Sequence, residues 1–254
     1  MHRPWQLTRQ GRGFVLTTLA LVLGAALVLG VVALALATAW YARDLPPLTK
    51  ATDYRPRQHL QVLAVDGSEI AAFGSERRVF VPVAQMPPVL KDALLAIEDT
   101  QFYEHFGISL KGIARATLAA LTGGMPQGAS TITQQVARTF FLSNRRTPER
   151  KIKEALLSLQ IERELSKDQI LELYMNQIYL GQRAYGFGAA AQVYFGKPVA
   201  AVSLAEAAML AGLPQNPIWA NPVVNLKRTS RRQRLMLNRM RDLGRITAAQ
   251  HEQA

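Results

Sequence analysis

The stretch RRTPERKIKEALLSLQIERELSKDQILELYMNQIYLG, residues 145–181, contains two helical patterns in succession, at about 149–165 and 167–180. Its apolar residues recur every three or four positions, which is the period of an amphipathic α-helix. The same spacing appears in the apolar run that follows Pro87 and again in residues 203–213. From Pro87 onward the chain is therefore predicted to be mainly α.

A short β element is predicted before this helical part. The segment LQVLAVDGSEIAAFGSERRVFVPV, residues 60–83, has two short apolar runs around Asp66-Gly67, which is a hairpin signal, and a third run at Val79–Val83. The preceding residues 43–58 are rich in proline and charge, as expected of a linker. We therefore expect a linker and a small β element at the start of the main domain.

An apolar segment near the N-terminus is long enough to cross a membrane. No charged residue occurs over the 27 positions from Phe14 to Trp40, and about 20 apolar residues suffice to span a bilayer. Arg3, Arg9 and Arg12 precede the segment, whereas Arg43 is the arginine that closely follows it. The positive-inside rule then predicts a cytoplasmic N-terminus and an extracytoplasmic main domain.

A cleaved signal peptide is the alternative for this segment, because Ala37-Thr38-Ala39 has the small-x-small form of a cleavage site. The apolar core of a signal peptide is only about 7–15 residues long, however. The length of the run therefore favours a permanent anchor.

The overall charge indicates an anionic partner. Thirty Lys and Arg against 18 Asp and Glu give a formal charge of +12. Outside the cytoplasm this charge is expected to meet membrane lipids or an anionic substrate, and no nucleic acid. The chain has no cysteine, which excludes disulfides, Cys-ligated zinc and a thiol nucleophile.

The first group of candidate site residues lies in AIEDTQFYEHFG, residues 96–107. Glu98 and Asp99 directly follow an apolar run, so at least one carboxylate is expected at the edge of the core. Desolvation raises the pKa of a carboxyl group and suits it to general-base catalysis near neutral pH. The alternative is a solvated helix end where Glu104 makes salt bridges and His105 caps the turn.

A second group lies in GASTITQQVARTFFL, residues 128–142, after a glycine-rich loop at 122–131 that we expect to be mobile. Uncharged hydroxyl and amide groups of this kind suit a sugar or a phosphate. The alternative is an N-capped amphipathic helix. The hydrogen-bonding side chains are Ser130, Thr131, Thr133, Gln134 and Gln135, with Arg138 one turn beyond Gln134.

The third group surrounds Glu154, which stands four residues after Arg150. A carboxylate among several cations is suited to a site for pyrophosphate. The alternative is an ordinary helix salt bridge worth a few tenths of a kcal/mol. The nearby cations are Arg145, Arg146, Arg150, Lys151 and Lys153.

Taken together, these segments resemble the five successive motifs of the family 51 peptidoglycan glycosyltransferases, over about residues 60–245. The resemblance implies a lysozyme-like, mostly α fold with a membrane-associated lobe. It also implies polymerisation of the lipid-linked precursor lipid II into glycan strands. The motifs, in order, are EDTQFYEHFG, GASTITQQ, RKIKE, KDQILELYMNQIYLG and LAEAAMLAGLPQNPIWANP.

The resemblance also implies roles for particular residues. Glu98 matches the catalytic base, and Glu154 matches the second catalytic carboxylate, near the pyrophosphate, where we also expect it to hold Mg²⁺ or Mn²⁺; no organic cofactor is expected. The positions of phosphate-contacting cations are matched by Arg115, Arg138, Arg146 and Lys153, with Arg138 where lysine is more usual. The other expected substrate contacts are Asp99, Phe102, His105, Ser130, Thr131, Gln134, Gln135, Arg150, Lys151 and Asn176.

The expected partners are lipid II, the growing lipid-linked glycan chain, membrane lipids and other proteins of cell-wall synthesis. Segments at both ends of the main domain resemble class A penicillin-binding proteins, so the chain is either a monofunctional enzyme or the N-terminal part of a longer one. The predicted organisation is a cytoplasmic tail at 1–13, a transmembrane anchor at 14–40, a linker at 41–59, the glycosyltransferase domain at 60–248 and a C-terminal tail at 249–254.

Two other functions fit parts of this pattern. A lysozyme-like hydrolase or lytic transglycosylase would have a similar carboxylate and fold, but no leaving pyrophosphate for the cations at 138–153 to neutralise. A catalytically inactive scaffold is disfavoured because both candidate carboxylates are present.

Overall fold

The protein divides into two units, Met1–Leu45 and Pro46–Ala254. The first contains α1 (Arg9–Ala42), whose residues Thr17–Ala42 are long and apolar enough to cross a membrane. The predicted anchor thus lies within one helix, while the predicted domain boundaries stay predictions. The part of the chain described by the computed structural model comprises residues 9–48, 60–66, 69–123, 128, 130–143, 145, 147–219 and 221–254.

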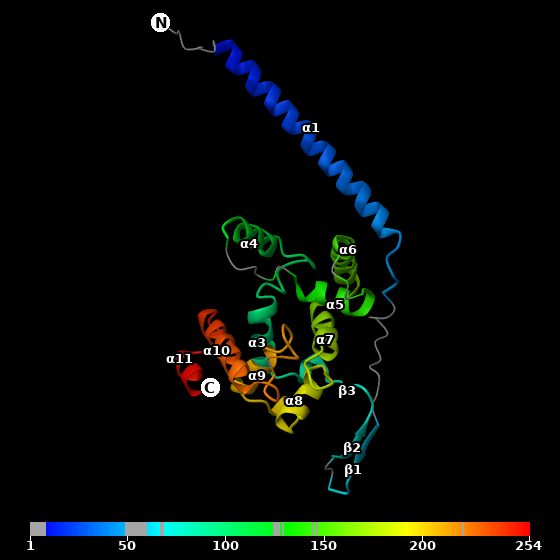
Figure 1. Cartoon of the computed structure of the whole chain (residues 1–254), viewed down its shortest axis with the longest axis vertical. Helices are drawn as coiled ribbons and strands as arrows, with labels where there is room; N and C mark the ends of the chain where they lie inside the picture. The colour runs from blue at the N-terminus through cyan, green and yellow to red at the C-terminus, as the bar shows by residue number, and fades with distance from the viewer. Residues whose placement is uncertain are drawn as a thin grey trace. The chain divides into compact units, whose positions relative to one another are not determined.

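The second unit is mainly helical, as predicted, with a small β element at its start (Figure 1). The predicted loop at 122–131 and linker at 41–59 lie in large part outside the described residues. The elements after α1 are β1 (Leu60–Leu63), β2 (Glu69–Phe73), β3 (Arg77–Arg78), η1 (Val83–Gln85), α3 (Pro88–Glu98), α4 (Leu110–Leu121), α5 (Ile132–Phe141), α6 (Pro148–Glu164), α7 (Lys167–Gln177), β4 (Ala184–Tyr185), α8 (Phe187–Phe195), η2 (Val199–Ala201), α9 (Leu204–Ala211), α10 (Leu226–Asp242) and α11 (Ala248–Gln253).

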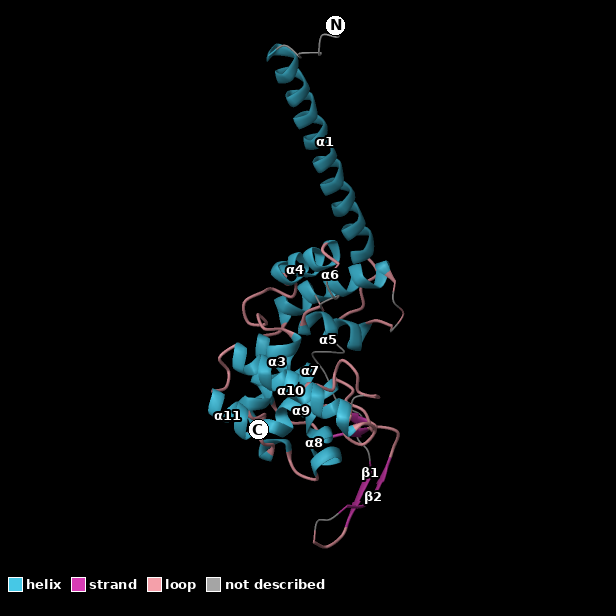
Figure 2. Ribbon diagram, turned by 60° about the vertical axis from the view of Figure 1, so that its left-hand side comes forward, coloured by secondary structure: helices cyan, strands magenta, loops and turns pink. Residues whose placement is uncertain are grey.

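Two groups of packed helices form the body of this unit. Helix α3 packs against α9 and α10, and α5 packs against α6 and α7, an arrangement that can be followed in Figure 2. Small side chains fill part of the first interface, where Ala93, Ala96, Ala208 and Ala211 are all buried. Alanines let helix backbones approach closely, so α3 is held firmly up to its last residue, Glu98.

The helices begin where the sequence supplies capping residues. Thr131 caps α5 and Gln134 bonds back to the Thr131 backbone, which is a complete capping box. Ser166 and Gln169 form the same arrangement at the start of α7. These caps explain why the observed helices begin close to the predicted positions.

The β element is only partly as predicted. Strands β1 and β2 form the expected antiparallel hairpin. The third run, Val79–Val83, was predicted as a strand, and this is wrong, because β3 is confined to Arg77–Arg78 and pairs in parallel with β4. The backbone N–H and C=O of Val81 are instead bonded to the side-chain amide of Asn176, at 2.9 Å each.

Close backbone packing was expected in the glycine-rich residues 183–198, and Gly188 confirms it. A Cβ atom at Gly188, in α8, would lie 2.5 Å from the carbonyl oxygen of Val79. Only glycine therefore allows the chain after β3 to lie against α8.

We expect Gly188→Ala to lower the free energy of unfolding by about 1–3 kcal/mol, because the added methyl group overpacks the contact with Val79. Without that contact, the same change inside a helix would stabilise the protein by about 1 kcal/mol. Denaturant melting of the full chain in detergent measures the difference. A variant as stable as the wild type, or more so, would contradict this packing.

Candidate active site

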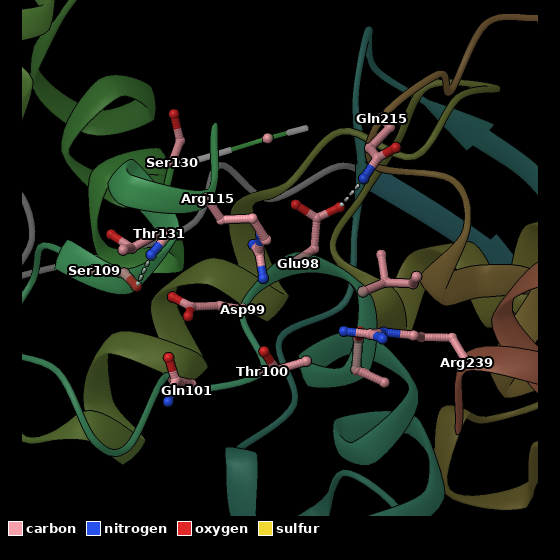
Figure 3. Close-up of a pocket in the computed structure, with 14 residues that line it drawn as sticks. Glu98, Asp99, Thr100, Gln101, Ser109, Arg115, Ser130, Thr131, Gln215 and Arg239 are labelled. Atoms are coloured by element: carbon pink, nitrogen blue, oxygen red, sulfur yellow. Dashed lines mark hydrogen bonds between the residues drawn. The ribbon is translucent and has the colours of Figure 1, made fainter. Parts of the chain in front are cut away.

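A cavity of about 570 Å³ opens at the C-terminal end of α3 (Figure 3). Its walls come from α3, the turn after it, α4, the start of α5 and the loop after α9. Figure 3 shows the side chains of Arg115 and Gln215 on opposite sides of Glu98. The polar residues that line it include Glu98, Asp99, Arg115, Ser130, Thr131 and Gln215.

Glu98 is held in this cavity by two amides. The Gln135 Nε2 donates to Oε2 of Glu98 at 2.7 Å, and the Gln215 Nε2 contacts Oε1 at the longer distance of 3.4 Å. Burial raises the pKa of Glu98 above its ordinary 4.5, while the two amides and the charges of Arg232 and Arg138 act in the opposite direction. A carboxylate with a raised pKa and one weakly engaged oxygen is suited to accept a proton.

Asp99, the next residue, is buried and joins α3 to α5. Its Oδ2 accepts hydrogen bonds from Nε2 of His105 at 2.9 Å and from the backbone N–H of Ile132 at 3.0 Å. Ile132 is the first residue of α5. Asp99 therefore fixes the position of this helix relative to Glu98.

Two neighbouring glutamines of α5 make hydrogen bonds near the two candidate carboxylates, Glu98 and Glu154. Gln135 bonds Glu98 and also accepts from the hydroxyl of buried Tyr174 at 3.4 Å. The Gln134 Oε1 accepts from Nζ of Lys151 at 3.3 Å. One short helix thus connects the surroundings of Glu98 with those of Glu154.

Glu154, in α6, is only 1% exposed and is surrounded by positive charge. One of its oxygens accepts from Arg150 and the other from Lys151, which also donates to Oγ of Ser130 at 2.8 Å. Both oxygens of Glu154 thus already have cationic partners, and no group of three His, Asp or Glu that could hold a metal occurs among the described residues. In this arrangement Glu154 does not fit Mg²⁺ or Mn²⁺.

The cations expected to contact phosphate are not all at the cavity. Arg115 lines it, and Arg138 is near enough for its charge to lower the pKa of Glu98. Lys153 pairs with Glu149 at 2.8 Å, along α6. Residues two positions apart point to different sides of a helix, so Lys153 does not share the face of Lys151. Arg146 lies outside the described residues.

Comparison with known proteins identifies the family. A family model described as transglycosylase matches residues 66–241. The chain belongs to the transglycosylase family. It is 52% identical over 211 residues to penicillin-binding protein 1A of Neisseria flavescens, covering 83% of this chain and 26% of that protein. It is 50% identical over 211 residues to penicillin-binding protein 1A of Escherichia coli K12, covering 83% and 25%.

A crystal structure of penicillin-binding protein 1A from Haemophilus influenzae has a TM-score of 0.46 and 30% identity, covering 78% of this chain and 20% of that one. The transglycosylase chain thus spans about a quarter of the length of the relatives it matches. The resemblance to the family 51 enzymes is confirmed.

Two expected substrate contacts of this transglycosylase are placed in the interior instead. Phe102 is 1% exposed and lies beneath the Nζ of Lys167, 4.6 Å from the ring centre. Asn176 is 4% exposed, and its side-chain Nδ2 donates to the backbone carbonyls of Val81 and Glu172. Both side chains are enclosed by protein atoms, and their contact with a substrate stays a prediction. His105 is also largely enclosed, against Asp99.

Three transglycosylase residues near Glu98 were not foreseen. Gln215 lies in the fifth motif, but the motif alone did not single it out. Arg232 donates to Oε1 of Gln215 at 2.6 Å, and Arg239 lines the cavity. Both arginines belong to α10, where seven residues between Leu226 and Asp242 are Lys or Arg, so nothing in the sequence distinguishes these two.

The raised pKa of Glu98 predicts a stability effect. The folded state binds a proton on Glu98 more tightly than the unfolded state, so the ionised carboxylate lowers stability at neutral pH. We expect Glu98→Gln to melt at a higher temperature than the wild type at pH 7. The gain should disappear as the pH falls below about 4, where unfolded glutamate is protonated as well.

Glu104→Gln is the matched control, because Glu104 is exposed and bonded only to Gln101 among the described residues. It should leave the melting temperature unchanged. Destabilisation of Glu98→Gln at pH 7 would show that burial does not penalise the charge of Glu98.

Proposed function

We propose that this chain is a peptidoglycan glycosyltransferase that polymerises lipid II into glycan strands. The observation that carries the proposal is the carboxylate of Glu98, which has a raised pKa and lies in a cavity beside fixed cations. Family membership supports the same reaction. The substrates are lipid II and the growing lipid-linked chain.

In this reaction Oε1 of Glu98 accepts the proton of the 4-hydroxyl on the acceptor sugar. The freed oxygen attacks the anomeric carbon of the growing chain, and the bond from that carbon to the pyrophosphate oxygen breaks. The configuration at the anomeric carbon inverts, and undecaprenyl pyrophosphate leaves. Oε1 suits this role because its contact with Gln215 is long, so it can also accept a hydrogen bond from a sugar hydroxyl.

The negative charge that develops on the leaving pyrophosphate needs positive charge fixed in advance. Lys151 and Arg150 supply it in our proposal, and Glu154 holds both in place. Arg115 at the cavity wall is a further candidate. The proposed reaction needs no metal at Glu154, because both of its oxygens are paired with cations.

Helix α1 is proposed to anchor the enzyme in the plasma membrane with its N-terminus in the cytoplasm, so that the catalytic domain is extracytoplasmic. The arginines before the helix support this orientation. Membrane lipids and other proteins of cell-wall synthesis are the proposed partners.

Glu98→Gln tests the proposed function. It keeps the size of the side chain and one oxygen that can accept from Gln135, but it removes the base. We therefore expect polymerisation of labelled lipid II to fall at least a hundredfold, the lower end of a typical general-base contribution. Glu154→Gln should also be severely impaired, because Arg150 and Lys151 lose their partner. Glu104→Gln should polymerise normally.

The assay is glycan chain length on labelled lipid II, using folded, full-length variants that still bind lipid II. Near-normal strands from Glu98→Gln would remove the proposed base. Cleavage of preformed strands by the wild type, without use of lipid II, would instead favour the lytic or hydrolytic alternative.

A further inference from the structure

Two polar residues, Gln215 and Arg232, approach the oxygen of Glu98 that Gln135 does not bond. The Nη2 of Arg232 donates to Oε1 of Gln215 at 2.6 Å, and Nε2 of Gln215 faces Oε1 of Glu98 at 3.4 Å. The three residues come from α10, the loop after α9 and the end of α3, so they are far apart in sequence.

Arg232 determines which end of the Gln215 amide faces Glu98. A guanidinium has only hydrogen-bond donors, so it can bond only to the oxygen end of the amide. The nitrogen end must then point towards Glu98, where it can donate to a carboxylate. If the amide turned round, its oxygen would face the carboxylate and would favour the protonated form of Glu98 instead.

Arg232 is itself fixed in place. Its Nε donates to the carbonyl oxygen of Gly212, at the end of α9, while Nη2 holds Gln215. The guanidinium is partly buried, which lowers the pKa of Arg232, and the carboxylate of Glu98 acts in the opposite direction. The same charge interaction lowers the pKa of Glu98.

We propose that Arg232 is a positioning residue that acts through Gln215 to orient the Glu98 carboxylate and to stabilise its charged form. This inference rests on the proposed role of Glu98 as the base. A direct Arg–carboxylate pair would engage both oxygens of Glu98 in strong bonds. The neutral amide in between transmits the charge and leaves Oε1 available to a sugar hydroxyl.

Other groups also act on Glu98, and the test must hold them constant. Arg138 lowers the pKa of Glu98 from α5, and the burial of Glu98 raises it. Tyr174, in α7, stays neutral because burial and the charge of Glu98 raise its own pKa. The remaining charged groups at the same cavity are Asp99, Arg115 and Arg239.

The test is the pH dependence of lipid II consumption by the full chain in detergent. Arg232→Gln removes the positive charge and the hydrogen bond that orients the Gln215 amide, and both losses raise the pKa of Glu98. We expect the acid limb of the pH–rate profile to move to higher pH. At pH 7 the rate should fall roughly ten- to a hundredfold, as for a misplaced catalytic group.

Matched variants separate positioning from folding. Arg232→Lys keeps the charge and should keep the acid limb near that of the wild type. Gln215→Leu leaves the bond from Arg232 to Gly212 in place and should move the limb in the same direction as Arg232→Gln, but by less. The control, Arg231→Gln, changes an exposed neighbour that has no ion pair among the described residues, and should alter neither rate nor profile.

An equal loss of rate at every pH in Arg232→Gln would overturn the proposal, because a purely structural residue behaves in that way. If Arg232→Gln does not fold, Gln215→Leu decides, and an unmoved acid limb in that variant overturns the proposal. Full activity of Glu98→Gln would instead remove the proposed function, so the two failures are distinguishable.

Discussion

The hydrogen bonds of Asp99 are the constraint on which the site depends. Asp99 receives the N–H of Ile132 at the start of α5 and the ring of His105 from the following turn. It therefore fixes α5 against the end of α3. Because α5 carries Gln135, the same bond places the amide that holds Glu98. The hydrogen bonds of Asp99 therefore set the positions of Glu98, the turn that carries His105 and helix α5 together.

The two carboxylates of the site lie in opposite electrostatic surroundings. Glu98 faces neutral amides, and its burial raises its pKa although the amides act in the opposite direction. Glu154 is almost wholly buried but has a cation on each oxygen. Environments that separate two carboxylates in this way commonly assign them different roles. Here Glu98 is suited to accept a proton and Glu154 holds Arg150 and Lys151 in place. Gln135 bonds Glu98, and the adjacent Gln134 bonds Lys151.

Local patterns in the sequence predicted the helices, their caps and the hairpin, because each depends on residues a few positions apart. They also predicted Glu98, Gln134 and Gln135 as site residues through motif resemblance. The prediction of a third strand at Val79–Val83 was wrong, because the backbone of Val81 bonds the side-chain amide of Asn176, which is distant in sequence. The sequence predicted both Lys151 and Lys153 at the site, because which face of α6 turns towards it depends on packing. Arg232 could not be predicted, because its contacts with Gly212 and Gln215 form only when α10 packs against α9 and α3.

The central claim is that burial raises the pKa of the Glu98 carboxyl in the free enzyme. The most direct measurement is a carbon-13 NMR titration of the glutamate side-chain carboxyls in the full chain, with the Glu98 signal assigned by its loss in Glu98→Gln. The account predicts that this signal titrates above the ordinary 4.5. Titration of Glu98 at or below that value would contradict it.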